Sequence, residues 1–327
     1  MQPLVSIAIP SYRQERYVRR ALDSCAASGY ENVELVIVND ASPENDDAEI
    51  RAWLDEHPDM QSRYVRHAEN RGLTRTLNEC IDLCHGAYVA ILAADDVLLP
   101  RSITSRVSYL ENHPDKLAVF TDSEVIDDAG NLLFRSGIEE LYPDRRMSRA
   151  ALRNERLLPL ELVFNWSVPG PAFMARRELY DVVGRYDETL AFEDWDMYLR
   201  IASAKKLGFL DECTAQYRWH TSNYVKELSV RRGNQDHFHV AARAARRFGG
   251  LAGLYLRGYS WPVHLTGRSG WNRIRRAFLA RTAPHILRSY RAYRELYLFL
   301  STLWSDAEYR ETCGAAYTHD GGAYGCD

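Results

Sequence analysis

The sequence lacks several features that would assign it to a common class of protein. It contains no run of about 18 uncharged apolar residues, so we expect no transmembrane helix. It has neither the G-x-G-x-x-G pattern of dinucleotide-binding dehydrogenases nor the Gly-rich N-terminal loop of nucleotidyltransferases. Its six cysteines are scattered without the spacing of a disulfide framework, and the N-terminus has the pattern of a strand, not of a signal peptide. We therefore expect reduced thiols and a cytoplasmic protein.

Lysine is missing from residue 231 onward, where fifteen arginines and seven acids give a net charge of about +8. Since the whole chain carries -4, the preceding residues carry about -12. An acidic body followed by an arginine-rich region indicates two different surfaces.

The first hundred residues alternate between strand-like and helix-like patterns. Strands are predicted over 4–10, 33–40, 63–67 and 87–96, and helices over 15–27, 46–57 and 73–86, the last with Gly86 as its C-cap. Cys80 and Cys84 share the apolar face of the last helix, so we expect buried thiols there instead of metal ligands. The rhythm predicts an α/β fold with a doubly wound, mostly parallel sheet.

Polar residues follow each of these four strands, at Pro10–Tyr12, Asn39–Ser42, His67–Gly72 and Asp95–Asp96. In doubly wound sheets ligands bind at the carboxyl ends of the strands, so we expect these four loops to converge on one site.

The second half of the chain departs from this rhythm. Residues 117–134 predict a strand, a turn and a return strand, and 142–156 form a polar, basic connection. Helices are predicted near 176–183 and from Glu193 to Ala204, followed by a strand over 214–220 and by helices from 231 to 304.

Asp95 and Asp96 are two like charges at the end of an apolar run. The simplest interpretation is a surface turn or a helix N-cap. Their place at the ligand-binding edge of the sheet favours a second interpretation, a metal site. Mg²⁺ binds through one or two carboxylates, and phosphate oxygens and water complete its ligands. A cation that carries a diphosphate would relieve the repulsion.

The stretch "NRGLTRTLNECIDLCHGAYVAILAADDVLLP" resembles the central block of family 2 glycosyltransferases, inverting enzymes of the GT-A fold. Three further stretches match that family's pattern in the same order: "VSIAIPSYRQERYVRRALDS", "LVIVNDAS" and "FEDWDMYLRIA". Together they cover residues 3 to about 220. Two positions depart from the pattern, since Ala93 and Asn39 stand where the family often has Asp.

The resemblance implies a nucleotide-sugar donor and assigns residues to it. Asp40 would accept a hydrogen bond from the imide N–H of uracil or thymine, and Arg71, between Asn70 and Gly72, would reach the base or the diphosphate. The residues expected to line or shape the remaining donor site are Pro10, Ser11, Tyr12 and Asp95. Without the resemblance, Tyr12 and Arg71 would be ordinary packing and surface residues.

The resemblance also assigns the metal and the base. Asp96 would be the principal ligand of Mg²⁺ or Mn²⁺, with Asp95 beside it, and His220 is a further candidate because a neutral imidazole binds metals. Asp194 would take the proton from the acceptor hydroxyl. The residues expected to bind the acceptor or support the base are Gly170, Glu193, Trp195 and Arg200. Acids in the first turn of a helix also stabilise its dipole, which is the simpler interpretation of Glu193 and Asp194.

Three interpretations of the arginine-rich helices remain open: nucleic-acid binding, for which no motif is present, a helical cap on the catalytic domain, and docking onto an anionic membrane. We expect a GT-A domain at 1–230, a helical extension at 231–304 and a flexible tail at 305–327.

Together these features predict a metal-dependent inverting transferase. Its donor would be a UDP- or dTDP-sugar and its acceptor a saccharide or a lipid-linked molecule, in surface polysaccharide synthesis. It would act in the cytoplasm or at the inner face of the plasma membrane. Formation of a homo-oligomer is possible on the sequence alone. The alternative is a non-catalytic nucleotide-sugar-binding subunit or sensor.

Overall fold

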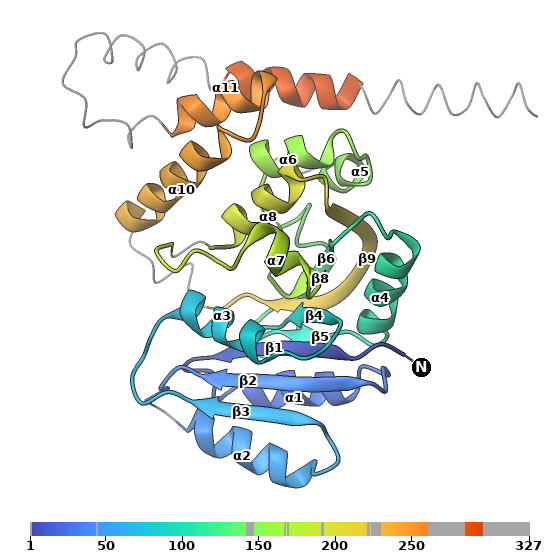
Figure 1. Cartoon of the computed structure of the whole chain (residues 1–327), viewed down its shortest axis with the longest axis vertical. Coiled ribbons are helices and arrows are strands. Elements are labelled where there is room, and N and C mark those ends of the chain that lie inside the picture. The colour runs from blue at the N-terminus through green and yellow to red at the C-terminus, as the bar shows by residue number, and fades with distance from the viewer. Residues whose placement is uncertain are drawn as a thin grey trace, which may run out of the picture.

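The alternating elements of the N-terminal half build the parallel part of one sheet in this computed structural model (Figure 1). The elements are β1 (Val5–Ser11), α1 (Val18–Ala26), β2 (Val33–Asn39), α2 (Asp46–Glu56), β3 (Ser62–Arg66), α3 (Leu73–Leu83) and β4 (Tyr88–Ile91). β1 lies parallel to β2 and β4, and β2 lies parallel to β3. The predicted parallel arrangement is therefore confirmed, and the carboxyl ends of these strands lie at one edge of the sheet.

The structure describes residues 2–43, 45–141, 147–166, 168, 170–190, 193–220, 223, 230–260 and 285–296. The predicted tail at 305–327 and residues 261–284 and 297–304 of the predicted extension lie outside these ranges, as does the start of the basic connection at 142–146.

The second half extends the sheet with antiparallel pairings, so the nine-stranded sheet is mixed. Its elements are β5 (Val97–Leu98), α4 (Ser102–Asn112), β6 (Ala118–Ile126), β7 (Leu132–Phe134), α5 (Ser148–Leu152), α6 (Leu158–Phe164), the 3₁₀ turn η1 (Gly170–Ala172), β8 (Phe173–Arg176), α7 (Leu179–Val183), α8 (Glu193–Ser203) and β9 (Leu207–Arg218). The strand order is β3-β2-β1-β4-β8-β6-β9-β5, with β7 beside β6. β8 pairs antiparallel with both β4 and β6.

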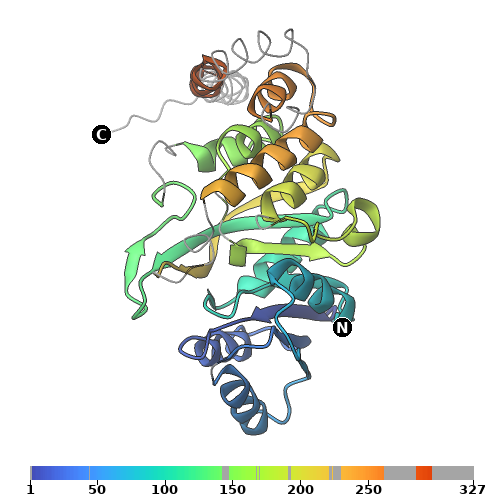
Figure 2. The same ribbon diagram turned by 90° about the vertical axis from the view of Figure 1, so that its left-hand side faces the viewer.

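Both faces of the sheet are buried, which explains why its strands are almost continuously apolar. Val5, Ile7 and Ile9 of β1 point into a core that α1, α2 and α4 cover. Ala8 points into the opposite core, which α3, α6 and α8 cover (Figure 2). Side chains alternate between the faces of a strand, so a single apolar strand supplies both cores.

Two helices of the arginine-rich region, α10 (Val230–Ala244) and α11 (Gly250–Tyr259), pack on α8 and α6. A third helix over 285–296 also contacts α6. There Arg294 forms a buried ion pair with Glu161 at 3.0 Å, and Tyr290 stacks on Phe164 with 4.5 Å between ring centroids. These contacts dock part of the region onto the body of the protein, as a helical cap would.

Several predicted boundaries are wrong. α3 ends at Leu83 with Cys84 as its C-cap, not Gly86. Gly86 is needed for another reason, because a Cβ atom there would lie 2.6 Å from the backbone nitrogen of Ser6. β4 ends at Ile91, β9 begins at Leu207, and the sequence patterns did not predict α4, α6 or β8.

The expectation for the helix cysteines is confirmed, since Cys80 and Cys84 are buried and unpaired. In the described parts of the chain, no helix has both the length and the apolarity needed to cross a bilayer.

Candidate functional site

The four polar loops converge at the carboxyl edge of the parallel strands, as expected from the fold. The backbone N–H of Asp40 donates to the carbonyl of Ser11 at 2.9 Å, and that of His67 donates to Asn39 at 2.9 Å. The side chain of Gln14 donates to Asp95 at 3.3 Å, which connects the loop after β1 to the loop after β4.

Asp40 is a fixed, buried acceptor at the centre of these loops. Its Oδ1 accepts the backbone N–H of Arg71 at 2.7 Å and its Oδ2 accepts that of Gly72 at 2.8 Å. Gly72 has φ +91°, a backbone conformation that side chains disfavour, so the loop can wrap around the carboxylate. His67 also contacts Oδ1, at 2.7 Å. A carboxylate oxygen can accept two hydrogen bonds, so Oδ2, which accepts one here, is the atom through which Asp40 would bind a base.

The other predicted donor residues lie around Asp40 but differ in exposure. Pro10 is inside β1, and Ser11 is buried with its hydroxyl donating to Asp46 at 3.1 Å. Tyr12 is exposed, and the Arg13 guanidinium lies 5.2 Å from the centre of its ring. The half-exposed side chain of Arg71 contacts Glu79 at 3.3 Å.

Asp95 and Asp96, just beyond β4, lie in different environments. Asp96 is 2% exposed, and its Oδ1 accepts the backbone N–H of Arg218 at 2.8 Å. Burial, together with the charge of Asp95, raises the pKa of Asp96 well above its usual range. The Asp95 side chain is less buried and faces His220. This geometry favours Asp95 over Asp96 as the principal ligand of a cation, the reverse of the ranking that the resemblance implies.

The side chains around Asp95 fit a divalent cation that is shared with a ligand. His220 Nε2 lies 3.0 Å from Asp95 Oδ2, which is the separation of two neighbouring ligands on an octahedral ion with bonds of about 2.1 Å. The Oε1 atom of Gln14 is buried without a hydrogen-bond partner, as expected beside a bound water or ligand hydroxyl. Among the described residues no group of three or more His, Cys, Asp or Glu side chains is placed to hold a metal. A cation at Asp95 and His220 would therefore need phosphate oxygens and water as its other ligands.

Arg218 is a residue of this region that the sequence patterns did not single out. Its Nε donates to the carbonyl of Asp95 at 2.8 Å and its Nη1 to that of Asp127 at 2.9 Å. Its guanidinium lies 4.9 Å from the ring centre of Tyr17, which is 5.1 Å from the His220 ring. Arg218 thus joins the end of β9 to the loop after β4 and holds His220 near Asp95.

A second acidic pair, Glu193 and Asp194, begins α8. Burial raises the pKa of Asp194 to about 6. Burial raises the pKa of Glu193 well above its usual range, and the charge of Asp194 raises it further. Both carboxyls thus hold a proton more tightly than an ordinary carboxyl, and Asp194 can accept a proton near neutral pH.

The N-terminal turns of α3 connect the start of α8 to Asp40. Thr74, two residues after Gly72, donates its hydroxyl to the carbonyl of Leu190 at 3.0 Å, just before α8. Asn78 exchanges two hydrogen bonds of 3.0 Å with the backbone of Tyr186. α3 is therefore bound both to the loop that holds Asp40 and to the segment Tyr186–Leu190 that precedes α8.

The remaining predicted residues hold the framework of this edge. Trp195 is buried and donates its indole N–H to the carbonyl of Leu162 at 2.9 Å. Arg200 pairs with Asp196 at 2.7 Å and donates to the carbonyls that precede the α8 loop, including that of Arg185 at 3.0 Å. Gly170 begins η1. Trp195 and Arg200 thus support α8.

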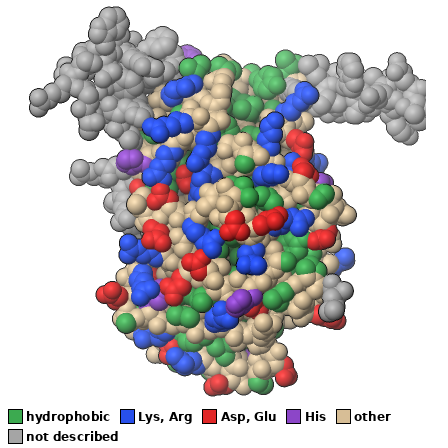
Figure 3. Space-filling model, viewed as in Figure 1, with side chains coloured by type: hydrophobic (Ala, Val, Ile, Leu, Met, Phe, Trp, Pro, Cys, Tyr) green, Lys and Arg blue, Asp and Glu red, His purple; other side chains and the backbone are tan. Residues whose placement is uncertain are grey.

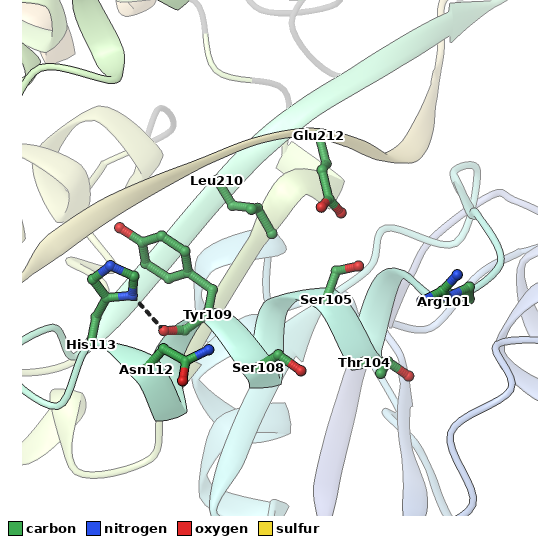
Figure 4. Close-up of a pocket in the computed structure, with 9 residues that line it drawn as sticks. All are labelled: Arg101, Thr104, Ser105, Ser108, Tyr109, Asn112, His113, Leu210 and Glu212. Carbon is green, nitrogen blue, oxygen red and sulfur yellow. Dashed lines mark hydrogen bonds between the residues drawn. The ribbon is translucent and has the colours of Figure 1, made fainter. Parts of the chain in front are cut away.

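A separate polar groove of about 340 Å³ lies between α4 and β9 (Figure 4). Its lining consists of Arg101, Thr104, Ser105, Ser108, Tyr109, Asn112, His113, Leu210 and Glu212. None of these residues belongs to the two acidic clusters, so we place the candidate site at the carboxyl edge of the sheet.

Comparison with known proteins identifies the family and the fold. The family model described as Glycosyl transferase family 2 matches residues 6–183. An uncharacterized glycosyltransferase of Rickettsia felis is 31% identical over 229 residues, covering 69% of this chain and 36% of the relative. Chondroitin synthase of Escherichia coli is 23% identical over 249 residues, covering 76% of this chain and 33% of the relative. The chain thus spans about a third of the length of these relatives.

Solved structures share the fold. The mannosyltransferase PcManGT of Pyrobaculum calidifontis, in complex with GDP-Man and Mn²⁺, superimposes with a TM-score of 0.58 at 19% identity, covering 93% of this chain and 87% of that one. The S. aureus protein TarS, in complex with UDP-GlcNAc, has a TM-score of 0.57 at 13% identity, covering 79% of this chain and 71% of that one. At these identities the likeness shows the fold alone.

Proposed function

The chain belongs to glycosyltransferase family 2, and on that premise we propose that it is a metal-dependent inverting enzyme. It transfers one sugar from a UDP- or dTDP-sugar to a saccharide or lipid-linked acceptor in surface polysaccharide synthesis. One observation carries the proposal: the N–H of Gly72, at the start of α3, binds Asp40, and Thr74 of α3 binds the carbonyl of Leu190, shortly before α8 begins. A nucleotide on Asp40 and an acceptor beside Asp194 would then meet at one edge of the sheet.

The donor base is recognised through Asp40. A fixed carboxylate acceptor suits the imide N–H of uracil or thymine and disfavours cytosine, whose corresponding nitrogen carries no proton. Guanine also has a protonated ring nitrogen, and the mannosyltransferase noted above was solved with GDP-Man. Guanine nucleotides are therefore the competing donor class.

Asp95 and His220, with Asp96 buried behind Asp95, would hold Mg²⁺ or Mn²⁺ together with the donor's diphosphate. When bound, such a cation stabilises the negative charge of the leaving nucleoside diphosphate as a Lewis acid. Asp95 and His220 orient the diphosphate, and the unpartnered Oε1 of Gln14 accepts a hydrogen bond from bound water or from the donor.

Asp194 acts as the base on the opposite side of the sugar. In inverting transfer an acceptor hydroxyl attacks the anomeric carbon while the nucleotide leaves from the other face. A carboxylate with a pKa of about 6 is ionised at neutral pH and takes the proton of that hydroxyl as the new bond forms. Glu193 supports the base or binds the acceptor.

The exposed surface of α11 fits an acceptor carried in a membrane. Figure 3 shows Lys and Arg side chains gathered over α10 and α11, where Leu251 and Leu254 are also exposed. Basic helices with exposed apolar side chains bind anionic bilayers. Flotation with anionic liposomes tests this, since Leu254→Asp should reduce binding whereas Leu132→Asp, at a leucine of β7 with almost the same exposure, should not. Equal flotation of both variants contradicts the membrane contact.

A panel of UDP-, dTDP-, GDP- and CDP-sugars with Mg²⁺ or Mn²⁺ tests the donor and the metal. A ligand that binds the folded protein raises its melting temperature according to ligand concentration over Kd. We expect stabilisation by UDP- or dTDP-sugars that depends on metal, and release of nucleoside diphosphate when an acceptor is added. Binding without release for any donor and acceptor would instead support the alternative of a non-catalytic sugar-nucleotide-binding subunit.

A further inference from the structure

We infer that Tyr17 is a positioning residue whose ring holds the imidazole of His220 in front of Asp95 and thereby raises the affinity of the site for the divalent cation that the diphosphate shares. This inference deepens the proposed function and rests on it. Tyr17 is the residue just before α1, and the sequence patterns assigned it no role.

The ring of Tyr17 lies against the ring of His220. Their centroids are 5.1 Å apart and their planes are inclined by 38°, which is within the usual range of aromatic contacts. On its Nε2 atom the same imidazole faces Asp95 Oδ2 at 3.0 Å. The imidazole therefore contacts both a buried aromatic ring and the carboxylate with which it would bind the cation.

The ring of Tyr17 is itself held by segments that are distant in sequence. Its hydroxyl donates to Asp128, in the turn between β6 and β7, and Arg16 pairs with the same carboxylate at 3.0 Å. The guanidinium of Arg218, at the end of β9, lies 4.9 Å from the centre of the Tyr17 ring and donates to the carbonyl of Asp127 at 2.9 Å. The ring is thus a fixed surface on which a neighbouring side chain can rest.

The backbone of His220 is held by contacts that do not involve Tyr17. Its N–H donates to Asn223 Oδ1 at 2.7 Å, and Asn223 Nδ2 donates to the carbonyl of Arg218 at 2.9 Å. Loss of the Tyr17 ring should therefore leave the loop in place and release only the imidazole. A side chain that must be ordered when a ligand binds weakens the binding, and residues that orient metal ligands typically change metal affinity by about 10- to 100-fold.

Calorimetric titration with UDP, in Mn²⁺ and in EDTA, tests this inference. The ratio of the Kd in EDTA to the Kd in Mn²⁺ measures how much the cation contributes to UDP binding. The variants are Tyr17→Leu, Tyr17→Phe, His220→Ala and the double variant of Tyr17→Leu with His220→Ala. The control is Tyr30→Leu, because Tyr30 is equally buried and its hydroxyl also makes a hydrogen bond, to the carbonyl of Pro3 at 2.8 Å. Circular dichroism and melting temperature establish that each variant is folded.

Tyr17→Leu should lower the ratio roughly tenfold, while the Kd in EDTA stays at the wild-type value. Tyr17→Phe keeps the ring and loses only the bond to Asp128, so it should keep most of the ratio. In the His220→Ala background Tyr17→Leu should cause no further loss, since the ring acts through the imidazole. The control should match the wild type. If Tyr17→Leu does not fold, Tyr17→Met replaces it, because a flexible side chain fills the space without a ring.

Several results overturn the inference alone when the wild type binds UDP more tightly with Mn²⁺. They are a wild-type ratio in Tyr17→Leu, an equal weakening in Mn²⁺ and in EDTA, as lost packing would give, and an undiminished effect of Tyr17→Leu without His220. A loss in Tyr17→Phe as large as in Tyr17→Leu assigns the effect to the Asp128 bond and also overturns it. A wild-type protein that binds UDP equally well in EDTA overturns the proposed cation. One that does not bind UDP overturns the proposed donor class, and either result removes this inference as well.

Discussion

Replacing Asp194 by Asn should abolish transfer and at the same time stabilise the folded protein. The two effects have one cause, since Asp194 lies in an environment that disfavours its charge. Burial raises the pKa of this carboxyl from its ordinary value of 3.8 to about 6. Catalysis by the ionised form therefore requires a charge that the surroundings of Asp194 disfavour in the folded protein.

The effect on rate follows from the role as base. Loss of a general base slows a reaction by roughly 10²–10⁴-fold. In the wild type, the fraction of ionised Asp194 at pH 5 is about a tenth, so kcat/KM should rise about tenfold from pH 5 to a plateau above pH 7. A carboxyl with an ordinary pKa would give a flat profile over this range.

The effect on stability has a definite sign. The folded protein holds its proton more tightly than the unfolded chain, so this group's contribution to stability is largest below pH 4 and is lost as pH rises to about 6. The shift of about two pKa units corresponds to an upper limit of about 3 kcal/mol. Asp194→Asn should thus have the wild-type melting temperature near pH 4 and a higher one, by several degrees, at pH 7.

The assay combines donor turnover with thermal unfolding at pH 4, 5, 6 and 7. Asp196→Asn is a matched control on the same helix, because Asp196 pairs with the largely buried Arg200 at 2.7 Å. Its loss should destabilise the protein by roughly 1–3 kcal/mol. An Asp194→Asn protein that keeps more than a tenth of wild-type kcat/KM refutes the assignment of the base. A lower melting temperature than wild type at pH 7 refutes the reasoning from burial.

Three other variants test separate parts of the structure. Asp95→Asn should lower kcat/KM with Mn²⁺ by roughly a hundredfold, and the measurement is repeated with EDTA. A ratio of kcat/KM with Mn²⁺ to kcat/KM with EDTA that equals the wild-type ratio would argue against a cation at Asp95. Gly86→Ala should lower the free energy of unfolding in urea by on the order of 1–3 kcal/mol, since the new Cβ meets the backbone nitrogen of Ser6. An unchanged free energy of unfolding would show that the backbone at Ser6 moves aside at little cost. Arg294→Ala should cost roughly 3–5 kcal/mol because it leaves Glu161 buried without its ion pair, and wild-type stability would show that the helix over 285–296 does not dock as described.

The fold of the first half was predictable because local patterns and tertiary structure agree there. The apolar face of α1 consists of Val18, Ala21, Leu22 and Cys25, and all four are buried as their spacing predicts. The second half was less predictable. β8 is only four residues long and follows a 3₁₀ turn. A segment of this length is too short to show whether its apolar residues repeat with the period of a strand or of a helix.

Part of the candidate site was predictable for the same reason. Asp40, Asp95 and Asp194 stand at strand ends or a helix start, where the fold class places ligands and where the family resemblance points. Gln14 and Arg218 were missed because their partners are distant in sequence, and His67 was placed in a polar loop of the site without a role. Arg218, for example, contacts Asp95 from 123 residues away.

The sequence by itself determined the order of strands and helices in the first half, the burial of its apolar faces and the family to which the chain belongs. These depend on periodicity and on residues a few positions apart, which the chain order already contains. Only the tertiary structure decided that Asp96 is buried while Asp95 faces His220, that His67 lies between two carboxylates, and that α3 contacts the segment before α8. Such features depend on burial and on contacts between distant segments, and those exist only once the sheet has formed.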